Sequence, residues 1–374
     1  MARDSMLDAL RVLVLAESPS LDKARCDACA DRVAALFHDR LNVEAIRHRR
    51  ADRGDHLEIR LGNGPSPIVV LCHHDTVWAE GTLDRLPFRI DGDRVTGPGT
   101  YDMKAGIVET AFALENANVK RPVIVLSTSD EEIGSTSSRA LIEETARGAT
   151  AVLVLEPAAS GGAVKTARKG IADFILEIEG RAAHAGVEPE KGISAIEEMA
   201  QQILALKALA DPAQGTTINI GVVSGGTRPN VVAAQARAEI DVRFTRADEA
   251  ARVVAAVNAL RPQLIGARIQ VSGGLDRPPM ERSEGVARLA ALARGLALEM
   301  GFELPETSTG GASDGNFTAA LGVPTLDGLG PDGGGAHADS EHLLVTSWLR
   351  RTKLLASADR DAVAAEAAPA AAYG

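Results

Sequence analysis

The sequence predicts an α/β protein in which helices cover a sheet and a second, α+β domain is inserted into the first. Between residues 56 and 155, short apolar runs alternate with stretches of helical periodicity, a pattern typical of strands packed between helices. From about 171 to 273 the predicted order is β-α-β-β-α-β, the split ferredoxin-like arrangement. We therefore assign 1–169 and 278–360 to one domain and 170–277 to an inserted domain.

The first domain is predicted to begin with two helices between residues 5 and 40, separated at the polar segment 17–20. Strands are then predicted at 56–61, 67–72, 122–127 and 151–155, and helices at 103–118 and 136–147. In sheets of this kind, binding sites gather at the carboxyl ends of the strands.

The inserted domain is predicted from changes in periodicity. Its strands are expected at 171–180, 216–223, 231–244 and 267–273, and its helices at 193–209 and 247–261. The first domain then resumes with a helix at 285–302, a strand at 323–329 and a last helix at 342–358. The Ala-rich end, 361–374, has the low complexity of a disordered tail.

The composition excludes some classes of partner. A formal net charge of −11 over 374 residues, with 3% aromatic residues, argues against a nucleic-acid partner, because phosphate needs clustered Lys and Arg. The sequence shows no secretory signal and no apolar run long enough to span a bilayer. Three cysteines, Cys26, Cys29 and Cys72, suggest reduced thiols. We expect a cytoplasmic protein with no membrane partner.

Five side chains of metal-binding type each follow an apolar run that is predicted to be a strand. They are His73 in VVLCHHDTVW, Asp102 in GTYDMKAG, Glu132 in LSTSDEEIG, Glu156 in VLVLEP and His337 in GGGAHADSEH. Two imidazoles and three carboxylates suit a pair of zinc-like ions that share one bridging carboxylate. Such a set predicts metal-dependent hydrolysis.

Neighbouring acids predict more specific roles. His73 and Asp75 point to the same side of an extended backbone, so Asp75 is predicted to orient the His73 imidazole. His74 points the other way and is given no role. In SDEEIG, consecutive side chains diverge, so Glu132 is assigned to metal and Glu131 to proton transfer.

Each motif also has a simpler interpretation when taken alone. HHD is compatible with a surface segment, and Asp102 with a helix cap. The acids of SDEEIG are compatible with the first turn of a helix, where the dipole favours them. Glu156 is compatible with a solvated strand end, and His337 with a glycine-rich turn. The joint order and strand-end placement of the five favour a shared site.

Together these segments resemble a known family. HHDTVW, GPGTYDMKAG, SDEEIG, LEP, GRAAHAG, RPN, STGGASDG and GAHADSEH are similar to the di-zinc metallopeptidases that include bacterial glutamate carboxypeptidases, aminoacylases, acetylornithine deacetylases and succinyl-diaminopimelate desuccinylases. The resemblance runs from about residue 10 to 358 and is greatest for the glutamate carboxypeptidases. It implies a zinc-peptidase catalytic domain, with a mixed sheet covered by helices, and an inserted ferredoxin-like dimerisation (lid) domain.

The resemblance implies two Zn²⁺ per subunit, with Co²⁺ or Mn²⁺ as alternatives. One ion would bind His73, Asp102 and Glu156. The other would bind Asp102, Glu132 and His337, so that Asp102 bridges. Glu131 would be the general base that takes a proton from the metal-activated water.

The resemblance also implies substrate contacts. His184 would reach the partner subunit's active site and help to stabilise the oxyanion, and Asn230 would contact substrate from the lid. Arg277 would grip the substrate's free carboxylate, and Gly310 and Gly311 would lie beside the substrate. Without the resemblance, His184 and Asn230 suit ordinary turn residues and Arg277 a domain-boundary ion pair. The roles of Lys165, Arg168 and Lys169, which lie near the expected substrate-binding lysine, are left open.

Combined, these inferences predict a di-zinc metallohydrolase. It would cleave an amide bond next to a C-terminal, glutamate-like amino acid of a small peptide or N-acyl substrate, and it would form a homodimer through the inserted domain. The alternatives are an N-acyl-amino-acid deacylase and, from another class, a non-catalytic metal-binding dimeric scaffold.

Overall fold

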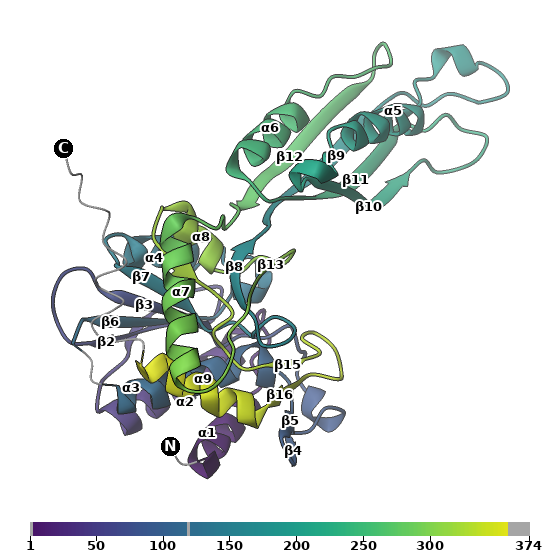
Figure 1. Cartoon of the computed structure of the whole chain (residues 1–374). Helices are drawn as coiled ribbons and strands as arrows, with labels where there is room; N and C mark the ends of the chain where they lie inside the picture. The colour runs from purple at the N-terminus through teal and green to yellow at the C-terminus, as the bar shows by residue number, and fades with distance from the viewer. Residues whose placement is uncertain (1–2, 118–119, 358–374) are drawn as a thin grey trace, which may run out of the picture. The chain divides into compact units, whose positions relative to one another are not determined.

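The computed structural model describes residues 3–117 and 120–357, which form two compact units (Figure 1). Unit 1 comprises Met1–Ala167, Arg282–Thr309 and Ser313–Gly374, and unit 2 comprises Arg168–Glu281 and Gly310–Ala312. The chain therefore leaves unit 1 for unit 2 and returns. The tail predicted at 361–374 lies outside the described residues.

A six-stranded mixed sheet forms the centre of unit 1. Its order is β1 (Ile46–His48), β2 (His56–Leu61), β6 (Val123–Thr128), β3 (Ile68–His73), β7 (Ala151–Val154) and β14 (Thr325–Leu326). β6, β3, β7 and β14 run parallel, whereas β2 runs antiparallel to β6 and to β1. The predicted sheet is thus confirmed, and β3 and β6 are buried at every residue.

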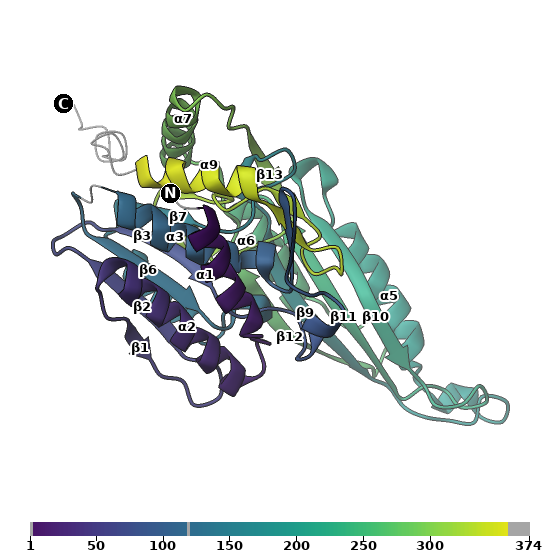
Figure 2. The ribbon, with the colours of Figure 1, turned by 90° about the horizontal axis from the view of Figure 1, so that it is seen from below.

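Helices cover both faces of this sheet, which explains the continuous burial. One face packs on α1 (Arg3–Leu15), α2 (Lys23–Leu41), α3 (Ala105–Asn116), α7 (Glu284–Glu299) and α9 (Val345–Ser357). The other packs on α4 (Arg139–Ala146) and α8 (Gly315–Ala320). Along β3, Val70 belongs to the first core and Val69 and Leu71 to the second, as the alternation of a strand requires. Figure 2 shows α2 beside β2.

Several short strands were not predicted. A small sheet has the order β15 (Gly333–Gly334), β16 (His342–Leu344), β5 (Arg94–Thr96) and β4 (Arg89–Asp91), and β8 (Val164–Arg168) pairs with β13 (Glu306–Thr309). Most of these strands are too short for an alternating pattern to be recognised. The small sheet matters because it joins the segment before Asp102 to the segment after His337.

Unit 2 is an antiparallel sheet with two helices. Its order is β10 (Thr217–Gly225), β11 (Gln235–Phe244), β9 (Gly170–Glu179) and β12 (Arg268–Arg277), and its helices are α5 (Ala195–Ala208) and α6 (Ala247–Asn258). Alternate residues of β9, such as Phe174 and Leu176, are buried in a core that α5 and α6 share. The predicted β-α-β-β-α-β arrangement is confirmed. Within residues 3–117 and 120–357, no helix is long and apolar enough to cross a membrane.

Candidate metal centre

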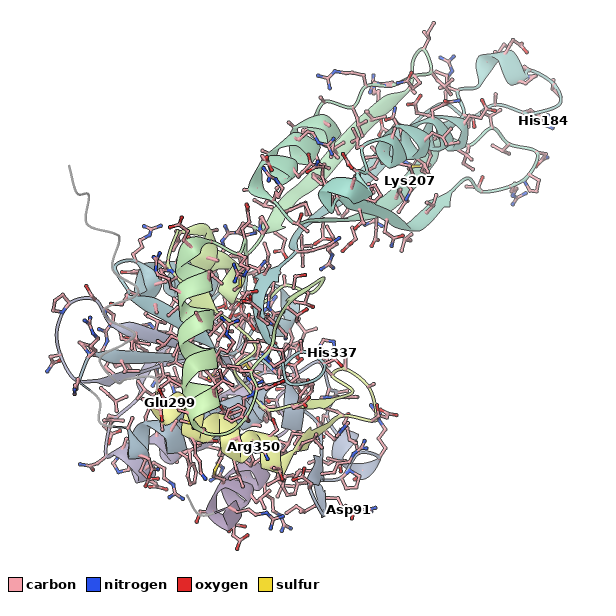
Figure 3. All side chains as sticks on the ribbon, in the orientation of Figure 1. Asp91, His184, Lys207, Glu299, His337 and Arg350 are labelled. Carbon is pink, nitrogen blue, oxygen red and sulfur yellow. The ribbon has the colours of Figure 1, made fainter. Side chains whose placement is uncertain are left out.

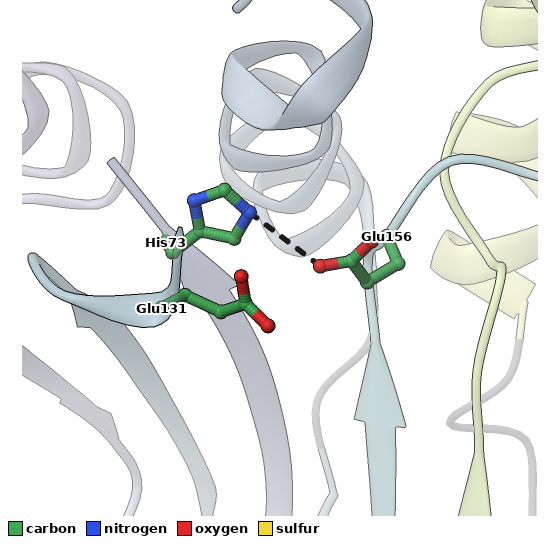
Figure 4. Close-up of side chains that lie close together, drawn as sticks. All are labelled: His73, Glu131 and Glu156. Atoms are coloured by element: carbon green, nitrogen blue, oxygen red, sulfur yellow. Dashed lines mark ion pairs between the residues drawn. The ribbon is translucent and has the colours of Figure 1, made fainter. Parts of the chain in front are cut away.

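Three parallel strands bring four of the predicted site residues to one edge of the sheet. His73 is the last residue of β3, Glu131 and Glu132 lie in a 3-10 turn (Glu131–Ile133) just after β6, and Glu156 follows β7. Figure 4 shows the side chains of His73, Glu131 and Glu156 close together. Their potential ligand atoms lie within 4.8 Å of one another. Convergence at this edge follows from the parallel pairing of β6, β3 and β7.

Asp102 and His337 come from loops. Asp102 lies in an irregular turn (Thr100–Lys104) before α3, with non-helical dihedrals of φ −116° and ψ 95°. Lys104, and not Asp102, occupies the N-cap position of α3, so the interpretation of Asp102 as a helix cap is wrong. His337 lies between β15 and β16 in the left-handed region, with φ 62° (Figure 3).

The five predicted ligands form a chain of contacts with Asp102 at its centre. Asp102 Oδ1 lies 3.3 Å from Nε2 of His73, and Asp102 Oδ2 lies 3.4 Å from Nε2 of His337. At the two ends, Glu156 Oε1 lies 3.4 Å from His73 Nε2, and Glu132 Oε2 lies 3.2 Å from His337 Nε2. Each oxygen of Asp102 thus faces a different imidazole, as a bridging carboxylate would.

The Nε2 atom of His73 faces this cluster with its lone pair. Its Nδ1 atom lies 3.1 Å from the carbonyl oxygen of Asp75. Because a carbonyl only accepts hydrogen bonds, Nδ1 carries the hydrogen. Nε2 then faces two carboxylate oxygens, and only a further proton or a cation makes that arrangement favourable.

Buried polar atoms without partners also suit metal ions. His73 Nε2, Asp102 Oδ1 and Glu132 Oε1 are buried and have no hydrogen-bond partner among the residues that the structure describes. Such atoms are costly to bury unless something binds them. Imidazole and carboxylate are the usual ligands of catalytic zinc, so the residues present fit a pair of such ions.

The pKa shifts within the cluster also favour bound cations. Asp102 and then Glu132 raise the pKa of His337 to about 10. Burial, followed by the charge of Asp102, raises the pKa of Glu132 to about 7. Burial alone would lower the pKa of His73, but Asp102, Asp75 and Glu156 outweigh it and the pKa is raised. Three carboxylates around two imidazoles carry excess negative charge, which divalent cations balance.

The carboxylate of Asp75 contacts both the His73 ring and the turn after β6. Its Oδ1 lies 3.4 Å from His73 Nδ1 and accepts the backbone N–H of Glu131 at 3.3 Å, while its Oδ2 accepts that of Glu132 at 3.3 Å. Burial would raise the pKa of Asp75, but His73 and the hydroxyl of Ser20 outweigh it and the pKa is lowered. A fully buried carboxylate therefore ties the end of β3 to the turn after β6.

Sequence reasoning missed two further buried acids near these loops. Asp314 accepts hydrogen bonds from the hydroxyls of Ser135 and, at 3.3 Å, Thr128, and so braces the loop that carries Glu131 and Glu132. Glu341 holds the turn of Asp102. Their only sequence signal was an acidic residue within the recognised segments STGGASDG and GAHADSEH.

The predicted substrate-binding residues lie in unit 2. His184 and Asn230 are exposed on adjacent loops, and the backbone N–H of Ala185 donates to the carbonyl oxygen of Asn230 at 3.0 Å. His184 lies on the loop between β9 and α5 (Figure 3). Arg277 is buried at the end of β12.

Arg277 lies at the opposite end of the unit 2 sheet from His184 and Asn230. Arg277 pairs with Ile171, at the start of β9, whereas the loop of His184 follows Glu179, at the end of β9. At about 3.3 Å per residue, this separation is roughly 26 Å along the strand.

The loop of Gly310 and Gly311 leaves space beside it. A Cβ at either glycine would meet no atom within 4 Å. Arg168 donates to the carbonyl oxygens of Gly311 and Ala312, both at 3.2 Å, so this buried side chain holds the loop. Lys169 Nζ donates to the carbonyl oxygen of Gly215 at 2.9 Å.

Comparison with known proteins identifies the family. A family model described as a peptidase dimerisation domain matches residues 166–265, most of which lie in unit 2. Carboxypeptidase G2 of Pseudomonas sp. (strain RS-16) is 33% identical over 305 residues, which cover 79% of this chain and 74% of that protein. The chain belongs to the M20 family of metallopeptidases.

Other similar proteins match nearly the full length of the chain. Succinyl-diaminopimelate desuccinylase of Thioalkalivibrio sulfidiphilus is 27% identical over 91% of this chain and 94% of that protein. The aminopeptidase PepT structure from Bacillus cereus ATCC 10987 superposes with a TM-score of 0.81, at 24% identity, over 97% of this chain and 99% of that chain. The YXEP protein of Bacillus subtilis, described as a dinuclear metal-binding M20 peptidase, has a TM-score of 0.67 at 14% identity, over 96% and 97% of the two chains.

Membership in the M20 family fixes the fold and the general activity. The fold is that of an M20 peptidase, with a metal-binding catalytic part and a dimerisation domain. The chain is a hydrolase of the kind that acts on peptide or acyl amide bonds. The predicted family and fold class are therefore confirmed.

Proposed function

We propose that this M20 hydrolase is a di-zinc carboxypeptidase that removes a C-terminal, glutamate-like amino acid from a small peptide or N-acyl substrate. The observation that carries the proposal is the arrangement of Asp102, whose two oxygens face the imidazoles of His73 and His337 at 3.3 and 3.4 Å. The similarity to carboxypeptidase G2 supports the carboxypeptidase assignment.

The proposal assigns three ligands to each ion. His73, Asp102 and Glu156 would hold one ion, and Asp102, Glu132 and His337 would hold the other. Such a pair of ions supplies Lewis acidity, which polarises the scissile carbonyl and makes water easier to deprotonate. Zinc suits these ligands, although Co²⁺ and Mn²⁺ use similar ones.

Glu131 would act as the general base. Its carboxylate lies within 4.8 Å of ligand atoms of His73 and Glu156, so it is close to the proposed reacting centre. It would accept a proton from the attacking water and donate it to the leaving amine. Such proton transfer is typically worth about 10²–10⁴-fold in rate.

The substrate contacts require two subunits. We propose that Arg277 binds the free carboxylate of the substrate, and that His184 and Asn230 serve the partner subunit's site. Arg277 and His184 lie roughly 26 Å apart along one sheet, whereas an extended dipeptide spans only about 7 Å. One copy of unit 2 therefore does not bring both ends to the same substrate, which supports a homodimer formed through unit 2.

We place this activity in the cytoplasm. Cys26, Cys29 and Cys72 are free and buried in the fold, which suits a reducing compartment.

An N-acyl-amino-acid deacylase is the second candidate. The 27% identity to the desuccinylase over 91% of this chain favours it. Both candidates bind a free carboxylate, and only the group on the acyl side of the bond distinguishes them. Family membership favours either enzyme over the non-catalytic scaffold.

A substrate panel tests the proposal. With zinc or cobalt supplied, we expect hydrolysis of benzoyl-glutamate and of dipeptides that end in glutamate to exceed that of N-acetyl-glutamate. Preference for N-acetyl-glutamate would favour the deacylase. No hydrolysis of any member by the metal-loaded protein would overturn both.

The Glu131→Gln variant tests the mechanism. We expect it to bind two metal ions and to lose about 10²-fold or more of kcat, because the amide does not accept a proton. Glu299→Gln, at an exposed residue near the end of α7, is the control. Wild-type turnover by Glu131→Gln would remove Glu131 from the role of base.

A further inference from the structure

Glu341 is a fully buried acid whose carboxylate accepts four N–H groups. Its Oε1 accepts the backbone N–H groups of Tyr101 at 2.9 Å and Asp102 at 3.1 Å. Its Oε2 accepts the indole N–H of Trp78 at 2.6 Å and the backbone N–H of Gly99 at 3.1 Å. Two of the four donors belong to the turn that carries Asp102, and a third, Gly99, immediately precedes it.

Other hydrogen bonds also hold that turn: the backbone N–H of Thr100 donates to Gly97 at 3.1 Å and that of Lys104 donates to Gly99 at 2.9 Å. Asp102 and Met103 have non-helical dihedrals, so the hydrogen-bond pattern of α3 does not extend through this stretch. Gly99 has φ +69°, and a Cβ there would lie 2.6 Å from Cγ2 of Thr76. Buried N–H groups need acceptors, and Glu341 supplies them for three of the four residues from Gly99 to Asp102.

Glu341 and His337 belong to the same loop. The backbone N–H of Glu341 donates to the carbonyl oxygen of Ala338 at 2.8 Å, and that of Ala338 donates to Gly335 at 2.9 Å, so the loop folds on itself. His337 faces Oδ2 of Asp102, while Glu341 holds the backbone N–H of Asp102. One loop therefore contacts Asp102 at both its side chain and its backbone, across 239 residues of sequence.

We propose that Glu341 is a positioning residue of the dinuclear metal centre, which fixes the backbone of Asp102 so that its two oxygens face His73 and His337. This inference rests on the proposed metal-dependent function. Glu341 acts through the backbone and does not bind the ions itself. Because both proposed ions would share Asp102, a displaced turn would weaken the binding of both.

The chemistry of the site requires a carboxylate. An ionised carboxylate only accepts hydrogen bonds and has about four lone-pair positions, which match the four donors. Glutamine has nearly the same shape, but its NH₂ group would face two N–H donors. Glu341→Gln therefore removes acceptors from the turn without removing side-chain volume.

Glu198 in unit 2 offers a matched control. It is also fully buried, and it accepts the backbone N–H groups of Gln263 at 3.0 Å and Leu264 at 2.7 Å and the amide of Gln202 at 2.6 Å. Glu198→Gln thus disturbs a buried carboxylate of the same kind in the other unit. A general loss of stability affects both variants, whereas a loss of metal affinity affects only Glu341→Gln.

The experiment is a titration of each full-length, metal-stripped protein with Co²⁺. The readouts are the cobalt absorption band in the visible range, the number of ions bound and the Tm. We expect Glu341→Gln to bind Co²⁺ about 10–100-fold more weakly than wild type, as is usual when partners of metal ligands are lost. Its cobalt band should also change shape. Glu198→Gln should keep the affinity and the spectrum of wild type.

The outcomes separate this inference from the proposed function. If wild type fails to bind two Co²⁺ ions, the proposed metal function itself fails. If wild type binds two ions and Glu341→Gln binds them with the same affinity and spectrum, Glu341 has only a structural role. If Glu341→Gln does not fold, Glu341→Asp replaces it, since the shorter side chain withdraws the carboxylate from the turn. Wild-type cobalt binding by Glu341→Asp would then overturn the inference.

Discussion

Asp75 accepts the backbone N–H of Glu131 at 3.3 Å, although 56 residues separate them in the sequence. Its second oxygen accepts the N–H of Glu132 in the same way. The acid that faces the ring of His73 therefore also sets the direction of the proposed base and of a proposed metal ligand. A change at Asp75 should disturb both at once.

We expect Asp75→Asn to lower kcat by about 10–100-fold while KM changes little, because the amide offers one acceptor to two N–H donors. Steady-state kinetics at saturating cobalt measure kcat and KM separately. Asp211→Asn is the control in unit 2, where Oδ1 of Asp211 alone accepts the backbone N–H groups of Ala213 and Gln214, so an amide keeps that acceptor. An equal loss in both variants would contradict a specific role for Asp75.

A mixed dimer tests whether His184 serves the partner's site. We expect His184→Ala and Glu131→Gln to be nearly inactive alone. When the two are co-expressed, a mixed dimer contains one site with both an intact base and an intact histidine. With random pairing in a two-fold dimer, activity should return to about one quarter of wild type.

The co-expressed His184→Ala and Glu131→Gln chains give a different result if the proposal is wrong. If His184 acts within its own subunit, every site lacks one of the two groups and no activity returns. If the two variants carry different tags, dimers with one chain of each can be purified, so that the pairing is known. Two wild-type chains that carry the same two tags provide the control.

Gly311→Ala probes the space beside the 310–312 loop. The added Cβ would meet no atom within 4 Å, and the φ of Gly311 is not positive, so we expect the Tm to stay within about 1 °C of wild type. If substrate occupies this space, KM should rise several-fold. Gly301→Ala, where φ is +80° with open space around it, controls for backbone strain. An unchanged KM in Gly311→Ala would place the substrate elsewhere.

Glu109 should make the protein less stable as the pH rises. It is buried on α3, and within residues 3–117 and 120–357 neither of its carboxylate oxygens has a hydrogen-bond partner. Burial raises the pKa of Glu109 well above 4.5, although the charge of Arg351 opposes this shift. Above pH 4.5 the unfolded chain releases this proton while the folded chain retains it, so stability falls until the pH passes the folded pKa.

Glu109→Gln removes this ionisable group, so the variant loses its contribution to the pH dependence of stability. We therefore expect the Tm of the variant, relative to wild type, to increase by a few degrees between about pH 5 and about pH 8. Calorimetry at both pH values measures this, and the comparison at one pH cancels the effects of other groups. A constant difference in Tm would show that Glu109 is ionised in the fold.

The strand ends of the catalytic part were predictable from sequence alone. The runs at 67–72 and 122–127 correspond to β3 and β6 within one residue, because continuous apolar runs bounded by polar residues are strong signals of buried strands. Parallel pairing then brings the carboxyl ends of these strands to one edge. The predicted placement of His73 and Glu131 at the ends of these strands follows in this way.

The loops were not predictable to the same degree. The helix expected at 103–118 begins only at Ala105, because the turn before it is held by Glu341, more than two hundred residues away. The short strands β15 and β16 also went unnoticed, since two or three residues carry no periodic pattern. Contacts of this kind leave no local trace in the sequence.

The sequence by itself determined the family, the two kinds of domain and the five side chains expected to bind metal, because residue type and periodicity are local properties. Only the tertiary structure decided that each oxygen of Asp102 faces a different imidazole, and that Asp75 and Glu341 hold the backbones of the site loops. The reason is physical: hydrogen bonds between distant segments depend on how the sheet and its loops fold together, and no spacing along the chain records them.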